Sequence, residues 1–234
     1  MLKNYAKFSL PVIMAGCLTA INAPVQALDT GDLLVRGRII NINPSADSGN
    51  VTSSAVGGEV AGTEVDVEDA YSLDIDFTYM FTPNIGAELL LDLSSKHDVV
   101  GKGATLAPLG TIIETRVLPP ALILQYHFLP DGEFRPYAGL GLNYTLFLSE
   151  KATSSLDTAL GGVGDVKLDS SFGWVGQVGM DYDLGNDLFF NLDVKYMDIN
   201  TTATFYSGAL GNVSTDVDIN PWVFGIGVGK RFSF

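Results

Sequence analysis

The chain has 234 residues, of which 47% are hydrophobic, and its 27 acidic against 13 basic residues give a formal net charge of −14. This acidic balance excludes nucleic acid as a partner, because a nucleic-acid-binding protein presents a basic face. Apolar residues are abundant, yet no run approaches the roughly 20 that a membrane-spanning helix needs. The composition is therefore typical of a protein that crosses a membrane with strands, in which apolar residues occupy alternating positions.

Residues 1–27 are typical of a secretory signal peptide. Two lysines precede an apolar run over 8–21, and Val25 and Ala27 are small residues at the positions that signal peptidase reads. The mature chain is therefore expected to begin at Leu28 and to leave the cytoplasm.

A second interpretation of the leader stays open, because residues 13–17 resemble a lipoprotein cleavage box that ends in Cys17. Cleavage there would leave a lipidated cysteine. The apolar run continues past Cys17, which favours the ordinary site. Cys17 is the single cysteine of the chain, so a mature chain that begins at Leu28 has no thiol or disulfide chemistry.

Alternation of apolar with polar or small residues predicts eight β-strands after the leader. The alternation is almost unbroken at 70–81, where Tyr71 and Leu73 alternate with Ser72 and Asp74. A strand buried on both faces would be apolar throughout, so each predicted strand is expected to have one lipid-facing and one inward face. In chain order, the predicted strands span 31–42, 70–81, 85–95, 114–128, 134–149, 170–184, 188–202 and the end of the chain within 219–234.

The final stretch, 219–234, shows the membrane pattern most clearly. Its bulky face has aromatic residues at both ends, and its other face is small or polar, with glycine at 225, 227 and 229. Such a face is typical of a lipid-facing strand, although an edge strand of a soluble sheet is the alternative. The terminal Phe234 resembles the signal by which the barrel-assembly machinery recognises outer-membrane barrels. The bulky face consists of Trp222, Phe224, Ile226, Val228, Phe232 and Phe234.

Short and long connections alternate strictly between the predicted strands, which up-and-down pairing explains. Tight turns are expected at the periplasmic rim, and long solvated loops at the extracellular rim. Pro119 and Pro120 cannot donate to a ladder, so pairing is expected to break there. The tight turns lie at 82–84, 130–132 and 185–187, and the long connections at 43–69, 96–113, 150–169 and 203–217.

The predicted fold is therefore all-β. Residues 28–234 form an eight-stranded antiparallel up-and-down transmembrane β-barrel with short periplasmic turns and long extracellular loops. A closed barrel leaves no unpaired strand edge in lipid, which is the condition for a sheet to cross a membrane.

Seven stretches carry a family resemblance: FTYM (77–80), NIGAELL (84–90), LPP (118–120), FRPYAGLGLNYT (134–145), GQVGMDY (176–182), YMDINTTA (196–203) and DINPWVF (218–224). In combination and in this order they resemble the OmpW family of small outer-membrane proteins. The resemblance implies a barrel in the outer membrane of a Gram-negative cell. It also implies a narrow, rather apolar lumen that passes small hydrophobic molecules, with lateral exit into the membrane.

The inward faces of the predicted strands carry charges of both signs, which departs from an apolar conduit. An eight-stranded barrel is barely wide enough to hold its own side chains, so these charges are expected to pair and plug the lumen. The alternation predicts that Glu88, Asp193 and Lys195 point inward, whereas Leu89, Val194 and Tyr196 face lipid. The candidates for the lumen or its constriction are Glu88, Leu90, Asp92, Asp193, Lys195, Arg36 and Arg38.

Aromatic residues near the strand ends are interpreted as anchors at the membrane–water interfaces rather than as a ligand cage. They are Tyr126, Tyr144, Trp174, Tyr196, Trp222 and Phe234.

No cofactor or metal site is predicted. The acidic runs at 64–69 and 216–218 lack the EF-hand pattern, so they are expected to be solvated or to bridge through cations to lipopolysaccharide phosphates. His97 and Asp98 follow two serines, a pattern that suggests acyl transfer or hydrolysis. Their spacing is not diagnostic, and we expect the protein not to be an enzyme.

Two functions remain open on the sequence. The first is a narrow passive channel for small, mainly hydrophobic molecules. The second is a plugged structural or interaction barrel whose extracellular loops bind lipopolysaccharide, a host surface or phage. The expected partners are outer-membrane lipid and lipopolysaccharide, the assembly machinery through Phe234, and small apolar solutes.

Overall fold

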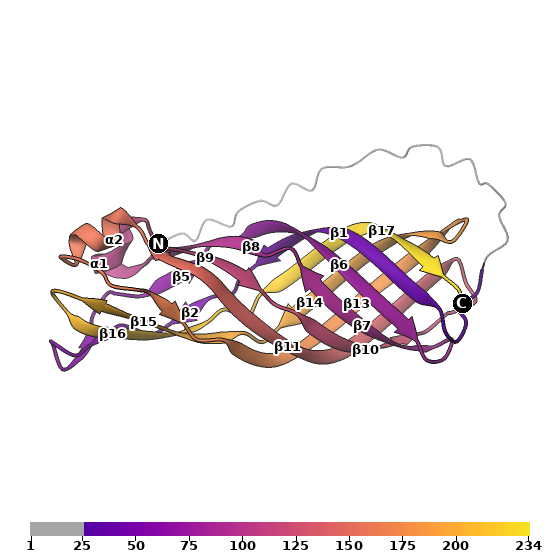
Figure 1. Ribbon diagram of the computed structural model, residues 1–234, viewed down its shortest axis with the longest axis horizontal. Helices are drawn as coiled ribbons and strands as arrows, with labels where there is room; N and C mark the ends of the chain where they lie inside the picture. Colours follow the sequence, from indigo (N-terminus) through magenta and orange to yellow (C-terminus); the bar gives the residue numbers. More distant parts are fainter. Residues whose placement is uncertain (1–25) are drawn as a thin grey trace, which may run out of the picture.

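The structure is a computed structural model that describes residues 26–234 (Figure 1). Most of the predicted signal peptide, including Cys17, lies outside the described residues. Within residues 26–234, every helix is too short or too polar to span a membrane.

Eight antiparallel strands close into a barrel, which confirms the predicted fold class (Figure 1). Around the barrel, each strand pairs with the next, and the ladder between β10 and β11 closes the circle. The barrel strands, in the order in which they neighbour one another, are β1 (Leu33–Asn43), β17 (Trp222–Phe232), β14 (Leu188–Met197), β13 (Ser171–Gly185), β11 (Phe134–Ala152), β10 (Ala121–His127), β7 (Ile85–Asp92) and β6 (Ala70–Met80).

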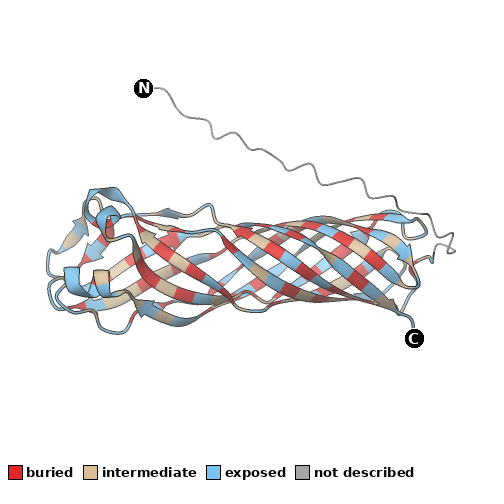
Figure 2. Cartoon of the chain, turned by 90° about the horizontal axis from the view of Figure 1, so that it is seen from above, coloured by how far each residue is buried: buried red, intermediate tan, exposed pale blue. Residues whose placement is uncertain are grey.

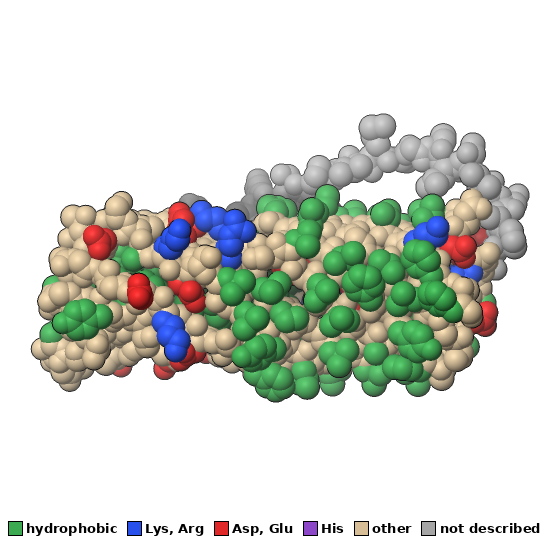
Figure 3. Space-filling model, in the orientation of Figure 1, with side chains coloured by type: hydrophobic (Ala, Val, Ile, Leu, Met, Phe, Trp, Pro, Cys, Tyr) green, Lys and Arg blue, Asp and Glu red, His purple; other side chains and the backbone are tan. Residues whose placement is uncertain are grey.

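Exposed and buried residues alternate along the barrel strands, as a period of two requires (Figure 2). On β17, Trp222, Phe224 and Ile226 are exposed, whereas Val223 between them is buried. Exposed apolar side chains occur on all eight barrel strands. On the face drawn in Figure 3 they form a band over the half of the molecule that contains the barrel, and charged side chains lie beyond its two ends. This band is the lipid-facing surface of a transmembrane barrel.

The three tight turns lie at one end of the barrel, together with the C-terminus (Figure 1). In the turn after β13, Asn186 and Asp187 have positive φ angles of 55° and 62°. Asn and Asp tolerate this backbone conformation better than most residues, which makes the two-residue hairpin possible. At the same end, the backbone N–H of Leu28 donates to the Pro130 carbonyl at 2.9 Å, and the Leu28 side chain is buried.

The four long connections are not solvated loops, so that expectation for 43–69, 96–113, 150–169 and 203–217 is corrected. They contain short strands and helices that extend the barrel wall beyond the membrane band (Figure 1). These elements are β2 (Asp47–Ser48), β3 (Val51–Ser53), β4 (Gly58–Val60), β5 (Val65–Val67), β8 (Ser95–Gly101), α1 (Gly103–Leu106), η1 (Ala107–Leu109), β9 (Thr111–Leu118), α2 (Ser154–Ala159), β12 (Lys167–Leu168), β15 (Asn200–Ser207) and β16 (Gly211–Asp218). We call this part the extension.

Apolar burial explains why the extension is ordered. Val51, Val65 and Val67 belong to strands of only three residues, yet their side chains pack into an apolar cluster with Ile113 and Val213. Alternation over three residues is too short to be recognised among glycines and acids, which is why 43–69 reads as a loop in the sequence.

Two predicted strands are each divided between the barrel and the extension. The predicted strand 114–128 consists of β9 and β10, which are separated by Pro119 and Pro120 as expected for residues that cannot donate to a ladder. The predicted strand 188–202 consists of β14 and the start of β15, and β15 pairs with β12 and β16 in a separate sheet.

Candidate functional site: the lumen and its apolar cavity

The half of the lumen near the tight turns is filled by paired ionic groups, which we call the plug. Arg36 is its centre and is completely buried. Its Nε and Nη2 donate to the two carboxylate oxygens of Asp181 at 3.1 and 2.8 Å. Its Nη1 donates to Asp76 at 2.8 Å and to the Thr78 hydroxyl at 2.7 Å. A buried guanidinium is tolerated because its donors have acceptors.

A second arginine forms the next layer of the plug. Arg38 Nε and Nη2 donate to the carboxylate of Asp74 at 2.8 and 2.9 Å, and Nη2 lies 2.9 Å from Asp76. Asp193 lies 3.5 Å from Arg38 Nη1 and accepts a hydrogen bond from Lys195 Nζ. Arg38 and Lys195 therefore share the acids of this layer.

Two glutamines connect the remaining acid to these layers. Gln125 Nε2 donates to Glu88 at 2.7 Å, and Gln177 Nε2 donates to both Glu88 at 3.1 Å and Asp193 at 2.7 Å. Glu88 also lies 3.8 Å from Arg36. The result is a continuous network of hydrogen bonds and ion pairs across the lumen, so the expectation that its charges pair is met.

Glycines on β17 make room for this network. A Cβ at Gly229 would lie 2.3 Å from Cζ of Phe189, and a Cβ at Gly225 would lie 3.2 Å from Cδ of Arg38. The inward face of β17 is therefore small because large side chains of its neighbours occupy the lumen there.

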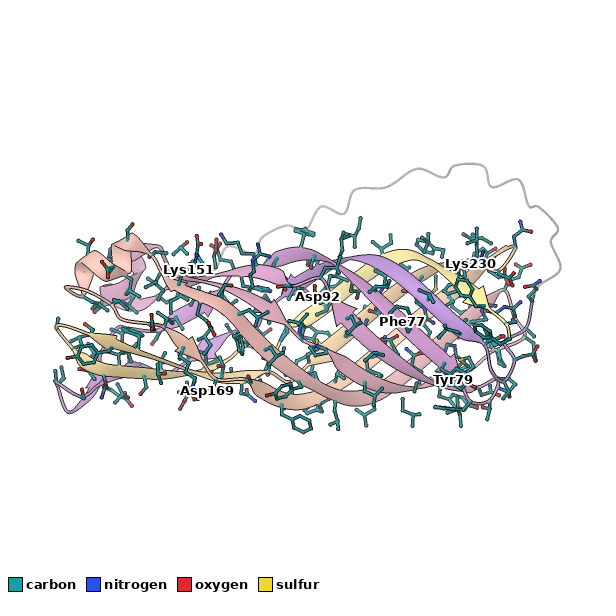
Figure 4. All side chains as sticks on the ribbon, viewed as in Figure 1. Phe77, Tyr79, Asp92, Lys151, Asp169 and Lys230 are labelled. Atoms are coloured by element: carbon teal, nitrogen blue, oxygen red, sulfur yellow. The ribbon has the colours of Figure 1, made fainter. Side chains whose placement is uncertain are left out.

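An apolar cavity of about 290 Å³ lies next to the plug, on the side where the barrel continues into the extension. Ile40, Ile42 and Val223 line it from the barrel, and Val99 and Val213 line it from the extension. Its lining contains few charged side chains: those of Asp74, Asp92 and Lys195 come from barrel strands that also border the plug. Asp92 lies near the middle of the long axis of the molecule (Figure 4). The lumen thus has a polar half and an apolar half.

The predicted lumen residues divide between these two halves. Leu90, Asp92 and Lys195 line the cavity, and all three are buried. The others, Arg36, Arg38, Glu88 and Asp193, are buried in the plug. Leu89, by contrast, is exposed on the outer face.

Sequence reasoning missed several members of both halves. Asp74 and Asp76 lie on the predicted inward face of 70–81, and Asp181 lies on that of 170–184. The same alternation that predicts an inward Glu88 therefore also predicts that these three acids point inward. The sequence pattern does not reveal the cavity walls in β8, β9, β15 and β16, because most of these residues lie in stretches whose sequence predicts loops.

One stretch of the wall beside the cavity lacks ladder pairing. The ladder between β7 and β10 ends at Leu90, and the ladder between β8 and β9 begins at Ser95. Between them, residues 91–94 and 118–120 form no ladder with each other. Pro119, which also lines the cavity, has no N–H with which to close this gap.

The predicted interface anchors lie on the outer surface. Trp174 and Trp222 each have a ring centroid 5.2 Å from that of Tyr196, so three strands share one aromatic cluster. Tyr144 is exposed on β11, and Tyr126 packs against Phe128 with a centroid distance of 5.2 Å. Phe234 is 94% exposed at the end of the chain.

Comparison with known proteins places this geometry in a family. The sequence model of the OmpW family matches residues 29–232. Outer membrane protein W of Vibrio cholerae is 41% identical over 212 residues, which cover 90% of this chain and 93% of the relative. Outer membrane protein W of Escherichia coli is 34% identical over 224 residues, which cover 95% of this chain and 99% of the relative.

A solved structure agrees with these relatives. The crystal structure of the outer membrane protein OprG from Pseudomonas aeruginosa matches with a TM-score of 0.84 and 34% identity, over 90% of this chain and 100% of that one. The chain belongs to the OmpW family, and it is a β-barrel of the outer membrane of a Gram-negative bacterium.

Proposed function

We propose that the protein is a narrow passive channel for small, mainly hydrophobic molecules. The observation that carries this proposal is the apolar cavity of about 290 Å³ that borders the plug. A cavity lined by aliphatic side chains accepts apolar molecules because their transfer from water is favourable. The plug, in contrast, is held together by buried ion pairs that a polar molecule would have to break in order to pass.

The plug gives the proposed route its direction. A molecule that continued toward the tight turns would have to separate Arg38 from Asp74, and Arg36 from Asp181, with no water to replace these partners. The plug is therefore a barrier to ions and apolar solutes alike. This barrier favours an exit through the wall rather than along the axis.

The unpaired stretch of wall is the proposed exit. Residues 91–94 and 118–120 have no mutual ladder to break, and Pro119 reaches the cavity. Leu93 within this stretch and Leu122, which follows it on β10, are exposed on the outer surface. An apolar molecule would therefore pass from the cavity into the acyl chains without entering water.

A cavity-filling variant tests the proposal. Ala203 is buried on β15 and lines the cavity, so Ala203→Phe places a phenyl ring in it. The matched control is Ala87→Phe, because Ala87 lies on the outward face of β7, where the next residues on the same face, Ile85 and Leu89, are exposed. We expect uptake of a small apolar solute into protein-containing liposomes to exceed that of empty liposomes, to fall with Ala203→Phe, and to persist with Ala87→Phe.

The rival proposal is an interaction barrel, and the filled lumen half is the observation that favours it. Uptake equal to that of empty liposomes would support this rival. It would direct the search to the extension, which carries exposed ion pairs such as Lys167–Asp169 at 3.5 Å. In that case we propose that the extension contacts lipopolysaccharide, a host surface or phage.

Two proposals concern how the chain reaches the membrane. We propose that residues 1–27 are removed, so that Leu28, buried against the Pro130 turn, begins the mature protein. We also propose that the exposed Phe234 is recognised by the barrel-assembly machinery. Mass measurement of the purified protein tests the first proposal, and the yield of folded Phe234→Ala in the outer membrane tests the second.

A further inference from the structure

A small group of polar side chains interrupts the apolar wall of the cavity. Ser95 and His97 on β8 and Thr115 on β9 are all buried, and all three line the cavity. His97 and Thr115 are direct partners in the β8–β9 ladder. Side chains of directly opposed residues lie close together on the same face of a sheet. We call Ser95, His97 and Thr115 the polar wall group.

Part of the polar wall group has no hydrogen-bond partner within the described chain. His97 Nε2 lies 3.0 Å from the Ser95 hydroxyl, whereas His97 Nδ1 and Thr115 Oγ1 make no hydrogen bond among residues 26–234. Leaving a buried polar atom unpaired is costly, so nearly all such atoms in folded proteins have partners. Another hydroxyl of the same cavity follows this rule, because Thr201 Oγ1 donates to the Asp169 carbonyl at 2.7 Å.

We propose that the polar wall group binds the single hydrogen-bonding group of an otherwise apolar molecule, such as a medium-chain alcohol, aldehyde or ketone. This inference rests on the proposed channel function and names the substrate class of its cavity. The hydroxyl of Thr115 can both donate and accept, and a neutral imidazole offers one donor and one acceptor. The apolar remainder of the molecule lies against Val99 and Ile113, the next inward pair of the same ladder.

The electrostatics of the cavity favour a neutral polar group over a charged one. Asp74 and Asp92 line the cavity together with a single cation, Lys195, which is already paired with Asp193. Because Asp74 is paired with Arg38, a carboxylate in the cavity would face Asp92 without a free cation and would lose its hydration. Burial also lowers the pKa of His97, which favours the neutral imidazole.

Binding fits the polar wall group better than covalent catalysis does. A serine–histidine pair that attacks an ester needs a third group that orients the imidazole. Asp98, next to His97 in sequence, instead lies 3.6 Å from Lys96, and both side chains are substantially exposed on the outer face. His97 Nδ1 therefore has no carboxylate partner in the described chain.

The test compares ligands that differ only in the polar group. The mature protein in lipid nanodiscs is equilibrated with 1-octanol, n-octane or octanoate, and bound ligand is measured by gas chromatography as the excess over protein-free nanodiscs. The variant is Thr115→Val, which keeps the shape of the side chain and removes its hydroxyl. The matched control is Thr201→Val, the same change at a hydroxyl that is already paired.

We expect the wild type to bind 1-octanol in preference to both n-octane and octanoate. Thr115→Val should weaken 1-octanol binding about fivefold, the effect of one net hydrogen bond, and leave n-octane binding unchanged. Thr201→Val should leave the preference for 1-octanol unchanged.

Different failures have different meanings. Equal binding of 1-octanol and n-octane, or a preference that Thr115→Val does not alter, overturns the polar wall group as a subsite while the cavity remains a hydrophobic site. A preference lost equally in Thr201→Val assigns it to general polarity and also overturns the inference. If none of the three ligands binds above the protein-free background, both this inference and the proposed channel are overturned.

Discussion

Arg36 on β1 and Asp181 on β13 are joined across the lumen by two hydrogen bonds, from Nε at 3.1 Å and from Nη2 at 2.8 Å. Their strands are not neighbours, because β17 and β14 lie between them on the shorter path around the barrel. The parallel pair of bonds fixes both distance and orientation. The plug therefore ties separated parts of the wall together as well as filling the space between them.

Removing the acid of this pair should strongly destabilise the barrel. Asp181→Ala leaves the Arg36 guanidinium buried without its main partner, and loss of one member of a buried ion pair costs about 3–5 kcal/mol. The free energy of unfolding, measured by urea titration in lipid, should fall by that amount. The control is Asp169→Ala at the exposed Lys167–Asp169 pair, which should change it by less than about 0.5 kcal/mol. Equal effects of the two variants would contradict a structural role for the plug.

Removing the Thr115 hydroxyl should stabilise the protein, although it should weaken binding of an alcohol. Thr115 Oγ1 is buried without a partner in the described chain, so Thr115→Val removes a desolvation penalty of about 1–2 kcal/mol. Thr201→Val should instead lower the free energy of unfolding, because it leaves the Asp169 carbonyl without its hydrogen-bond donor. Urea titration of ligand-free protein measures both changes. A lower stability of Thr115→Val would show that the hydroxyl is satisfied in the folded protein.

His97 should make the folded protein less stable in acid. Burial lowers its pKa below the ordinary value of 6.5, so the unfolded chain takes up a proton before the folded chain does. The stability contributed by the neutral imidazole is fully present above the unfolded pKa and is lost as the pH falls from that value through the lower pKa of the folded chain. The difference in unfolding free energy between wild type and His97→Gln should therefore shift against the wild type as the pH falls below the ordinary histidine pKa of 6.5. His127 is common to both proteins and cancels; a difference that does not vary with pH would contradict the prediction.

Replacing Pro119 and Pro120 should slow the exit of an apolar solute through the barrel wall. Pro119→Ala together with Pro120→Ala restores the backbone N–H groups that the two prolines lack, so that a ladder with residues 91–94 can extend into the gap. We expect slower uptake of an apolar solute into liposomes. Pro44→Ala is the control, because Pro44 lines the same cavity outside this gap. Unchanged uptake in the double variant, or an equal loss in Pro44→Ala, would place the exit elsewhere.

The barrel itself was predictable because its strands are long and have two chemically different faces. Eight or more alternating residues, as in β6 and β17, specify both strand and phase, and the placement of Glu88 and Lys195 inside follows from that phase. The extension was not predictable in the same way. Its strands are often two or three residues long, and their order depends on packing between segments that are distant in sequence, such as Val51 and Val213.

The candidate site was only partly predictable for the same reason. The sequence places charges in the lumen and indicates that they pair, but the choice of partner across the barrel, such as Arg36 with Asp181, requires the closed structure. The apolar cavity is formed jointly by barrel strands and the extension, so it does not appear in a sequence whose long connections are taken as loops. Thr115 and His97 become neighbours only when β8 and β9 pair.

We propose that the lumen passes apolar molecules and blocks ions. The most direct test measures both in one preparation: uptake of a small apolar solute by an internal acceptor, and release of an entrapped small ion, from liposomes that carry the mature protein. Empty liposomes give the background for both. We expect apolar uptake above this background and ion release equal to it. Ion release above background would contradict the plug, and apolar uptake at background would contradict the channel.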